Sequence, residues 1–355
     1  MSRVTIAEVA KAAGVSKATV SRVLSGNHKY LTPETRRRVE QAIKQLDYRP
    51  STVARSLTSK RTNTVGVLVA DISNPFYPDV FLGIEDGAVK HGYNVFLCNT
   101  NYDLARGKNY IQSLVDKRVD GVLIMTSSFS REWLVELERN NVPVIVLDWE
   151  VQSRGSNQST IAVDFERGIH AAVEHLYGLG HRRFAHVGGP PLLQTSRDRR
   201  NAFLCALAEY GIDRTEVPVI DGNLRIDAGR HAVKELLTLP QWPTAVFAAN
   251  DMMAIGMLLE ARTKGIRIPD DLSVVGLDDI WLAAQTEPPL TTVALPRYEI
   301  GQLAMRLLFD LLDRPREDYI ETVATVVRTS LVIRQSTGPA PISTTAHVVS
   351  SIPSL

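Results

Sequence analysis

From residue 65 onward, short apolar runs rich in β-branched residues alternate with longer amphipathic stretches. Four runs have the length and composition of strands buried on both faces: VGVLVA (65–70), NVFLCN (94–99), GVLIMT (121–126) and VPVIVLDW (142–149). Three stretches between them repeat apolar residues at helical spacing, around 78–91, 106–118 and 131–140. This alternation predicts a parallel sheet covered by helices on both faces.

A second series of runs repeats the pattern further along the chain: RFAHVGG (183–189), VPVIDG (217–222), TAVFAAN (244–250) and LSVVGLD (272–278). Two successive series predict two similar lobes, each a doubly wound parallel sheet. Ligands of such sheets bind beyond the carboxyl ends of the strands. Polar and aromatic residues that directly follow a strand are therefore candidates for a binding site.

The first fifty residues instead predict three short helices joined by tight connections. Thr5 and Glu8 form a capping box, and Gly14 ends this first helix at a position that tolerates positive φ. Ser16 can cap a second helix, and Thr32, which precedes a proline, can start a third. Two short helices so closely connected are typical of a helix-turn-helix, whose second helix lies in the major groove of DNA. The pattern alone is equally compatible with an ordinary three-helix bundle.

The distribution of charge favours DNA. The formal net charge of the chain is only +1. Residues 1–60, however, carry 12 Lys and Arg against 4 Asp and Glu, a net charge of +8, while the remainder carries 28 basic and 35 acidic residues, a net charge of −7. Positive charge concentrated in one small module is expected where that module meets a polyanion and the rest does not.

Cysteine usage and targeting signals narrow the compartment. Cys98 and Cys205 lie in apolar stretches without a metal-ligand spacing, which argues against a structural metal and fits a reducing compartment. The N-terminal segment lacks the apolar core of a secretory signal, and no run approaches the ~18 apolar residues of a membrane span. We therefore expect a soluble cytoplasmic protein that needs no cofactor and has no membrane partner.

Two segments resemble a known family. TIAEVAKAAGVSKATVSRVLSG and TPETRRRVEQAIKQLDYRPSTVARSL are similar to the N-terminal part of the lactose/galactose-repressor (LacI/GalR) family of bacterial regulators, and the resemblance extends to about Gln335. It implies an all-α helix-turn-helix headpiece and an α/β body like that of periplasmic binding proteins, with two doubly wound parallel-sheet lobes. It also implies a repressor that binds a pseudo-palindromic operator in double-stranded DNA as a homodimer, under the control of a small effector.

The resemblance assigns roles in DNA binding. Lys17, Ala18 and Arg22 would read base edges, since an arginine can pair with guanine through two hydrogen bonds and an alanine methyl can meet that of thymine. Contacts with phosphate, which fix the register without reading sequence, would come from a second set: Thr5, Ser16, Thr19, Ser21 and Asn27.

The eight residues from Pro50 to Leu57 resemble the hinge helix of the family. The resemblance places Ala54 and Leu57 at the minor groove, where a leucine from each subunit wedges into the central base step and kinks the duplex. A helix of this length is marginal alone because helix nucleation is costly. We therefore expect the hinge helix to order only on DNA.

The resemblance also places a set of residues around a cleft between the lobes: Asn74, Phe76, Tyr77, Asp148, Arg199, Phe247, Asn250 and Asp278. Aromatic faces would cover the apolar side of a ring, while carboxylates, amides and a guanidinium would fix its polar groups. The implied effector is a sugar, a sugar phosphate or a purine. Phe247 could instead be a core residue, and Asp251 is better placed to cap the following helix than to bind ligand.

One position departs from the family pattern. Many relatives have glutamine before the proline of the segment TTVALP, whereas this chain has Leu295. The segments SNPFY and KRVDGVLIM look closest to ribose- and purine-type regulators. These features narrow the effector only to a small polar molecule, and the sequence leaves open whether that molecule acts as an inducer or as a corepressor.

The expected domains are a headpiece at 1–49, a hinge and linker at 50–60, an effector-binding and dimerisation domain at 61–335 and a disordered tail at 336–355. Within the body, the first lobe would span about 62–162 plus 291–320 and the second about 163–290 plus 321–335, with crossovers near 161–164, 289–292 and 320–324. The tail is rich in Ser, Thr and Pro, which favours disorder. It lacks leucine heptads, so a dimer is favoured over a tetramer.

Two other classes of protein could use such a body. An enzyme is disfavoured because no phosphate-loop, nucleophile-elbow or HExxH motif occurs. Asp148 and Asp278 could be imagined as a glycosidase pair, but carboxylates in a sugar cleft more often accept hydrogen bonds. A transport-associated binding protein is opposed by the basic headpiece and the missing secretory signal. The sequence therefore predicts a DNA-binding regulator.

Overall fold

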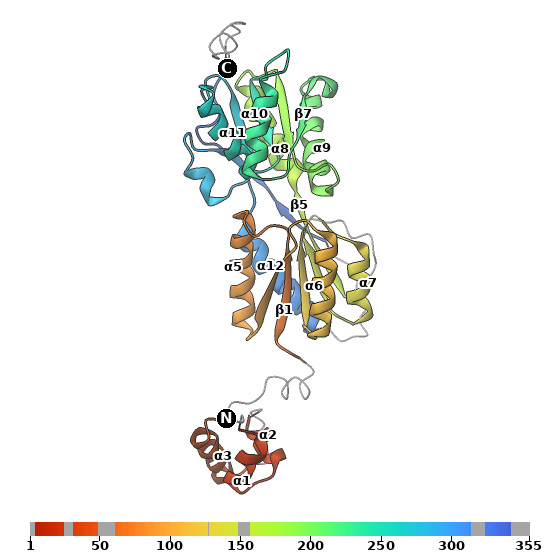
Figure 1. Ribbon diagram of the computed structural model, residues 1–355, viewed down its shortest axis with the longest axis vertical. Coiled ribbons are helices and arrows are strands. Elements are labelled where there is room, and N and C mark those ends of the chain that lie inside the picture. The colour runs from red at the N-terminus through yellow and green to blue at the C-terminus, as the bar shows by residue number, and fades with distance from the viewer. Residues whose placement is uncertain are drawn as a thin grey trace. The chain divides into compact units, whose positions relative to one another are not determined.

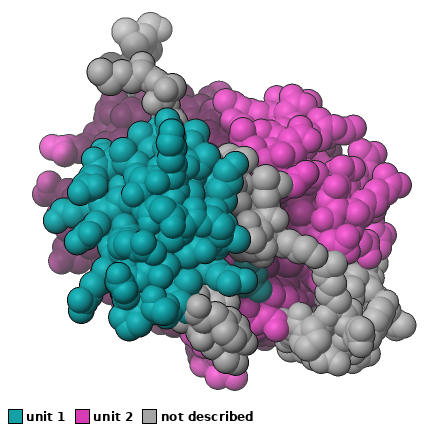
Figure 2. Space-filling view, turned by 90° about the horizontal axis from the view of Figure 1, so that it is seen from below, with its two compact units in different colours: residues 1–62 teal, residues 63–355 magenta. Residues whose placement is uncertain are grey.

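The computed structural model describes residues 4–24, 31–48, 61–126, 128–147, 157–313 and 324–341. The chain divides into two units, residues 1–62 and residues 63–355 (Figure 2). The predicted hinge helix lies outside the described residues, and so do four of the predicted site residues: Asn27, Ala54, Leu57 and Asp148.

Three helices form the described part of the headpiece: α1 (Ile6–Ala13), α2 (Lys17–Leu24) and α3 (Pro33–Gln45). They share a small apolar core in which Val9, Val20 and Val39 have no exposed surface. Fully burying one such side chain contributes roughly 1.5–3 kcal/mol. The core is thus built by one buried face on each helix, as the apolar spacing predicts.

The headpiece helices begin and end where the sequence signals predict. The backbone amide of Thr5 donates to Glu8 Oε2 over 2.7 Å, and the amide of Glu8 donates to Thr5 Oγ1 over 3.4 Å, which confirms the capping box. Gly14 follows α1 with φ of 63°, in the left-handed region that favours glycine. The hydroxyl of Thr32 accepts from the amide of Thr35 at the start of α3.

Twelve strands are described in the body, in two sheets of six (Figure 1). The first sheet contains β1 (Thr64–Val69), β2 (Asn94–Asn99), β3 (Gly121–Met125), β4 (Val144–Leu147), β5 (Gln158–Asp164) and β11 (Ala324–Arg328). The second contains β6 (Phe184–Gly188), β7 (Val219–Asp221), β8 (Ala245–Ala248), β9 (Ser273–Asp278), β10 (Thr291–Ala294) and β12 (Ser330–Val332).

The two sheets have the same strand order. It is β11-β5-β4-β3-β1-β2 in the first and β12-β10-β9-β8-β6-β7 in the second, and all neighbours are parallel except β10 and β12. The first lobe carries α5 (Phe76–Lys90), α6 (Leu104–Asp116), α7 (Arg131–Arg139) and α12 (Arg297–Asp313). The second lobe carries α8 (Phe165–Gly178), α9 (Gln194–Glu209), α10 (Ile226–Leu236) and α11 (Asp251–Thr263). The predicted fold class is confirmed.

Strand pairing corrects the predicted lobe boundaries. β10 pairs with β9, so residues 291–294 belong to the second lobe, and the chain crosses at Leu295 and Pro296, later than predicted. β11 pairs with β5, so residues 324–328 belong to the first lobe, and the chain crosses back at Thr329. Short apolar strands beside a crossover do not reveal by their pattern which sheet they join. The first crossover, between β5 and α8, lies next to the predicted position (Figure 1).

The segment 336–341 is ordered, although the disordered tail was predicted to begin at residue 336. Ser336 is fully buried, where its hydroxyl donates to the carbonyl of Val274 and accepts from the amide of Thr291. The carbonyl of Gly338 bonds to His181 Nε2, and its amide donates to a serine hydroxyl at the start of β9. Small polar residues suit this role because their backbones can run along the ends of strands. Composition therefore mispredicted this segment, since its backbone groups have partners in the body.

No helix in the part of the chain that the structure describes is long and apolar enough to cross a membrane.

Candidate functional site

Helix α2 presents the three residues expected to read DNA bases. It buries Val20 and Val23 in the headpiece core and leaves Lys17, Ala18 and Arg22 exposed. Positions 18 and 22 are about one turn apart and so share a face of the helix. The structure therefore brings the predicted base-reading residues together on the accessible side of α2.

The residues expected to contact phosphate also hold the helix ends. The hydroxyl of Thr5 contacts Glu8 Oε2 at 2.9 Å, and the hydroxyl of Ser16 accepts from the amide of Thr19 at 3.1 Å. Thr19 and Ser21 are half-buried. Helix N-termini attract anions because their first amides lack partners within the helix. Thr5 and Ser16 stand at such termini, and their contact with phosphate stays a prediction.

In the body, residues that follow the strands of both sheets line one cavity of about 50 Å³. Six of the eight predicted effector residues are there: Asn74, Phe76, Tyr77, Arg199, Asn250 and Asp278. The remaining lining is Tyr102, Met125, Thr126, Leu147, Val163, Phe165, Thr195, Leu224 and Leu295. The first lobe and the second lobe both contribute, so the cavity lies between them.

Phe247 is a correction to the predicted site. It is fully buried in β8, where its ring stacks on Phe203 with centroids 5.1 Å apart and on His186 with centroids 5.7 Å apart. Side chains alternate along a strand, and this one points into the core of the second lobe. The alternative interpretation of Phe247 as a core residue is the one the structure supports.

Sequence reasoning missed Tyr102 and Thr126. Both follow strands of the first sheet, β2 and β3, so the rule that ligands bind beyond the carboxyl ends of strands could have found them. Phe165 and Thr195 lie at the starts of α8 and α9, and no motif marks them. Leu295, noted as a departure from the family pattern, lines the cavity and makes this part of it apolar.

Arg199 is held by two contacts and keeps one donor unused. Its Nη1 donates to the carbonyl of Ala249 over 2.8 Å, and its guanidinium lies 4.6 Å from the ring centre of Phe165. Its Nε is buried and has no hydrogen-bond partner among the described residues. An unsatisfied buried donor costs about 1–3 kcal/mol. A ligand that supplies an acceptor to this N–H would recover that energy.

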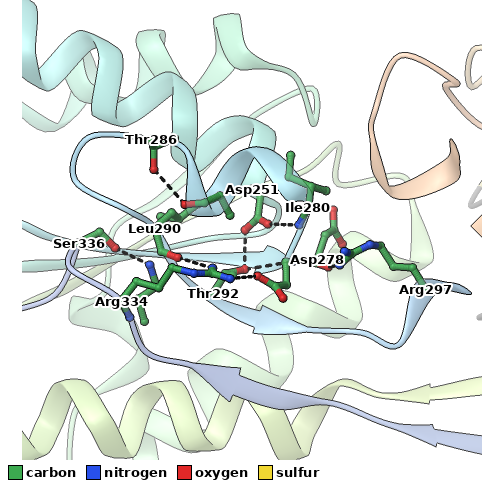
Figure 3. A network of polar contacts seen from close by, with 12 residues as sticks. Asp251, Asp278, Ile280, Thr286, Leu290, Thr292, Arg297, Arg334 and Ser336 are labelled. Carbon is green, nitrogen blue, oxygen red and sulfur yellow. Dashed lines mark hydrogen bonds and ion pairs between the residues drawn. The ribbon is translucent and has the colours of Figure 1, made fainter. Parts of the chain in front are cut away.

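Asp278 is almost fully buried at the end of β9, in a turn with unusual backbone conformation. Its φ is 120°, and that of Asp279 is 52°. Such conformations cost of order 1–3 kcal/mol each for residues other than glycine and persist only where the surroundings enforce them. Two arginines do so, and they approach from opposite sides (Figure 3): Arg297 Nη1 donates to the carbonyl of Asp278 over 2.5 Å, and Arg334 Nη2 donates to Asp279 Oδ1 over 2.6 Å.

The charge state of Asp278 is set by opposing effects. Burial raises the pKa of its carboxyl to about 6, while the charges of Arg199 and Arg297 and a hydrogen bond from Asn74 lower it. The carboxylate form of Asp278 therefore prevails near pH 7. A buried acceptor and a buried donor facing one small cavity suit a ligand that carries hydroxyl groups.

Asp251 does not have the capping role expected of it, and Asn250 has a capping role in addition to lining the cavity. Asn250, not Asp251, caps α11: its Oδ1 accepts from the amide of Met253, and its Nδ2 donates to the carbonyl of Leu224. Asp251 is fully buried, and its carboxyl oxygens accept from the amide of Ile280 and the hydroxyl of Thr292 (Figure 3). Burial and the nearby charge of Asp278 raise the pKa of Asp251 to about 8. Both residues thus brace the strand ends that carry Asp278.

No group of His, Cys, Asp and Glu among the described residues has an arrangement that could hold a metal ion.

Comparison with known proteins identifies the family of the chain. The family model for bacterial regulatory proteins of the lacI family matches residues 5–51, and the model for a periplasmic binding protein-like domain matches residues 173–337. The chain is 34% identical over 333 residues to the HTH-type transcriptional repressor PurR of Aliivibrio salmonicida. The matched region covers 94% of this chain and 98% of that protein.

Two solved structures are similar along most of their length. A lac repressor dimer bound to operator and the anti-inducer ONPF superimposes with a TM-score of 0.83 at 28% identity, covering 95% of this chain and 100% of that one. A regulator of Enterococcus faecium with bound ribose superimposes with a TM-score of 0.71 at 33% identity, covering 78% of this chain and 99% of that one. The chain therefore belongs to the lacI family of bacterial regulatory proteins.

Proposed function

We propose that this chain represses transcription as a homodimer on a pseudo-palindromic operator and that a free monosaccharide, bound between the lobes, sets its affinity for DNA. Its relatives are ligand-controlled transcriptional repressors, so it is a DNA-binding regulator and not an enzyme. The observation that carries the proposal is the cavity where Arg199 and Asp278 meet, in a chain that also carries the exposed face of α2. Operator DNA lies in the bacterial cytoplasm, which is where we place the protein.

The lining of the cavity supports a monosaccharide. Phe76 and Tyr77 offer aromatic faces to one side of a ring, and Arg199 and Asp278 offer a donor and an acceptor to its hydroxyls. Arg199 is the one cationic side chain in the described lining, whereas a phosphate group is usually met by several donors or cations. A free sugar is therefore favoured over a sugar phosphate. The bound ribose of the Enterococcus faecium regulator points the same way.

Exposed apolar residues on the first lobe support the homodimer. Leu82 and Val89 of α5 are 53% and 67% exposed, and Phe96 and Leu97 of β2 are 43% and 40% exposed. β2 is an edge strand, and apolar side chains on an exposed edge are typical of a surface that is covered in the assembly. A second copy of the chain is the proposed partner, as in the lac repressor dimer.

On DNA, each subunit would place α2 in one half-site. Lys17, Ala18 and Arg22 would read base edges, and Ala54 and Leu57 of the hinge would meet the minor groove between the half-sites. A dimer matches an operator whose half-sites are related by the same two-fold symmetry. Because coupling between two sites is reciprocal, a sugar that weakens DNA binding must bind less tightly to the DNA-bound protein.

A thermal-shift screen of the full chain tests the effector. The panel is free pentoses and hexoses, their phosphates, and purines. We expect one free monosaccharide to raise the Tm, since a ligand at a hundred times its Kd stabilises the native state by about 2.7 kcal/mol. Arg199→Ala should remove this shift. A shift produced by a phosphorylated sugar or a purine, but by no free sugar, would contradict the proposed effector.

A further inference from the structure

Arg225 joins the two lobes directly. It precedes α10 in the second lobe, and its Nε and Nη2 donate to Asp71 Oδ2 over 3.0 and 2.9 Å. The same Nη2 donates to Asn101 Oδ1 over 2.6 Å. Asp71 follows β1 and Asn101 follows β2, both in the first lobe. The guanidinium of Arg225 thus binds, from the second lobe, residues that follow two strands of the first lobe.

Each side of this contact is fixed within its own lobe. Asp71 has a side chain only 9% exposed, and its Oδ1 accepts from the amide and the hydroxyl of Ser73. Asn101 has φ of 53° in a tight turn after β2. The amide of Arg225 donates to Asn223 Oδ1. Because both sides are preformed, the contact is made or broken by movement of one lobe against the other.

The contact lies at the rim of the effector cavity. Leu224 and Tyr102, the chain neighbours of Arg225 and Asn101, both line the cavity. The side chain of Arg225 is 46% exposed, whereas that of Asp71 is buried. The guanidinium is therefore partly exposed to solvent, beside residues that line the cavity.

We propose that Arg225 is a clasp that holds the cleft closed, so that the effector must fit wholly beneath it. Arg225 does not line the cavity, and it acts on the effector through the position of the lobes. The claim that Arg225 selects the effector rests on the proposed function, whereas the claim that Arg225 holds the lobes together does not. A ligand of two sugar rings would have to displace the guanidinium from Asp71 and Asn101, which makes the clasp a determinant of effector size.

A matched control is available within the second lobe. Arg230 of α10 has a side chain 44% exposed and pairs with Glu260, whose side chain is 7% exposed, over 3.5 Å. It resembles Arg225 in exposure and in having a buried carboxylate partner, but both partners belong to the same lobe. Arg225→Ala and Arg230→Ala therefore differ in whether the lost contact crosses the cleft.

Amide hydrogen exchange of the ligand-free full chain tests closure. We expect Arg225→Ala to speed exchange at residues 99–102, in the other lobe, relative to the wild type, and Arg230→Ala to leave that segment unchanged. Faster exchange at 222–226 alone would be a local effect of the substitution. The clasp is overturned if residues 99–102 exchange equally fast in all three proteins, or if the two variants speed them alike.

Calorimetric titration with D-ribose and cellobiose tests selection. We expect the wild type to bind D-ribose and reject cellobiose, and Arg225→Ala to bind D-ribose about five-fold more weakly, the effect of a partly exposed ion pair. Equal D-ribose affinity in both proteins, or cellobiose binding by the wild type with residues 99–102 still protected, overturns the clasp as a determinant of selection. If the wild type binds neither sugar, these sugars are excluded as effectors, and the exchange result still decides closure.

Discussion

Single residues of the effector cavity differ in how far the sequence could predict them. Arg199, Asp278, Asn74 and two aromatic residues were predicted from the resemblance and lie together in the structure. The capping role of Asn250 was not predictable, because an amide beside a helix start can bind ligand, cap the helix or do both, and only the hydrogen bonds to Met253 and Leu224 reveal the cap. The charge states of the two buried aspartates likewise depend on tertiary burial, which a motif does not encode.

Effector binding should depend on the ionisation of Asp278. Since the pKa of this carboxyl is raised to about 6, the carboxylate that accepts from sugar hydroxyls is present at pH 7.5 and lost below pH 6. We expect the affinity for the identified sugar to fall with decreasing pH, by up to about ten-fold per unit below pH 6. Calorimetric titration between pH 5 and 8 measures this. Asp278→Asn should bind weakly at every pH, and an unchanged wild-type affinity from pH 5 to 8 would contradict the assignment.

Asp251 should make the body less stable as pH rises. Its folded-state pKa of about 8 is above the ordinary value near 4, so the native state keeps a proton that the unfolded state releases between these pH values. The free energy of unfolding should therefore fall with rising pH across this window, by up to about 1.4 kcal/mol per unit. Burial lowers the pKa of His186 to about 4. This shift makes the free energy of unfolding rise with pH, but only below about pH 6.5, the ordinary pKa of histidine.

Between pH 6.5 and 8, Asp251 but not His186 thus makes the free energy of unfolding depend on pH. Denaturant unfolding followed by tryptophan fluorescence reports on the body, since all four tryptophans lie there. Asp251→Asn should flatten the slope, because the amide stays neutral. The exposed Asp270→Asn should retain the wild-type slope. Equal slopes in all three proteins would refute the raised pKa.

At the scale of helices and strands, the sequence predicted which elements exist better than it predicted where they belong. All eight strands expected from the two apolar series are present. The other four described strands, β5, β10, β11 and β12, are not part of those two series, because they lie beside crossovers where the chain changes sheet. Pairing with β4, β9, β5 and β10 decides their lobes, and such pairing is a property of the assembled sheets.

Glycines set the packing of one helix pair in each lobe. A Cβ on Gly301 of α12 would lie 2.1 Å from the carbonyl oxygen of Val80 in α5, and one on Gly256 of α11 would lie 2.0 Å from that of Ile226 in α10. Backbone atoms cannot move aside as a flexible side chain can. The glycines therefore allow each pair of helices to approach closely over its sheet.

Gly301→Ala should destabilise the body by about 1–3 kcal/mol, the usual cost of forcing extra volume into a packed interior. Denaturant unfolding measures the change. Gly178→Ala is the control: it lies at the end of α8 with no neighbour within 4 Å of the added methyl group, and alanine is the better helix former. Equal stability of the two variants would show that α5 and α12 can separate without cost.

At the scale of the whole molecule, the proposed function requires two headpieces that are both linked to the cleft. Residues 1–60 of one chain, with a formal net charge of +8, can attract DNA, but a pseudo-palindromic site requires two such modules. Homodimerisation through the apolar surface of α5 and β2 would supply the second.

Phe96→Asp should therefore give monomers that bind the operator weakly. Its side chain is 43% exposed on the edge strand β2, and a charge there opposes burial in an interface. Sedimentation velocity measures the oligomeric state. Leu192→Asp is the control, because Leu192 is 90% exposed in the second lobe, away from this surface. A dimeric Phe96→Asp protein would place the interface elsewhere.

The central claim is that a sugar in the cleft controls the affinity of the headpiece for DNA. Its most direct test is the equilibrium affinity for an operator selected from random DNA by the full chain, measured by fluorescence anisotropy at fixed salt with and without the sugar found in the thermal screen. We expect a saturating sugar to change the wild-type affinity by about 5- to 150-fold. Arg199→Ala should bind the operator like the sugar-free wild type and respond to no sugar. An operator affinity that is the same with and without saturating sugar would contradict the account.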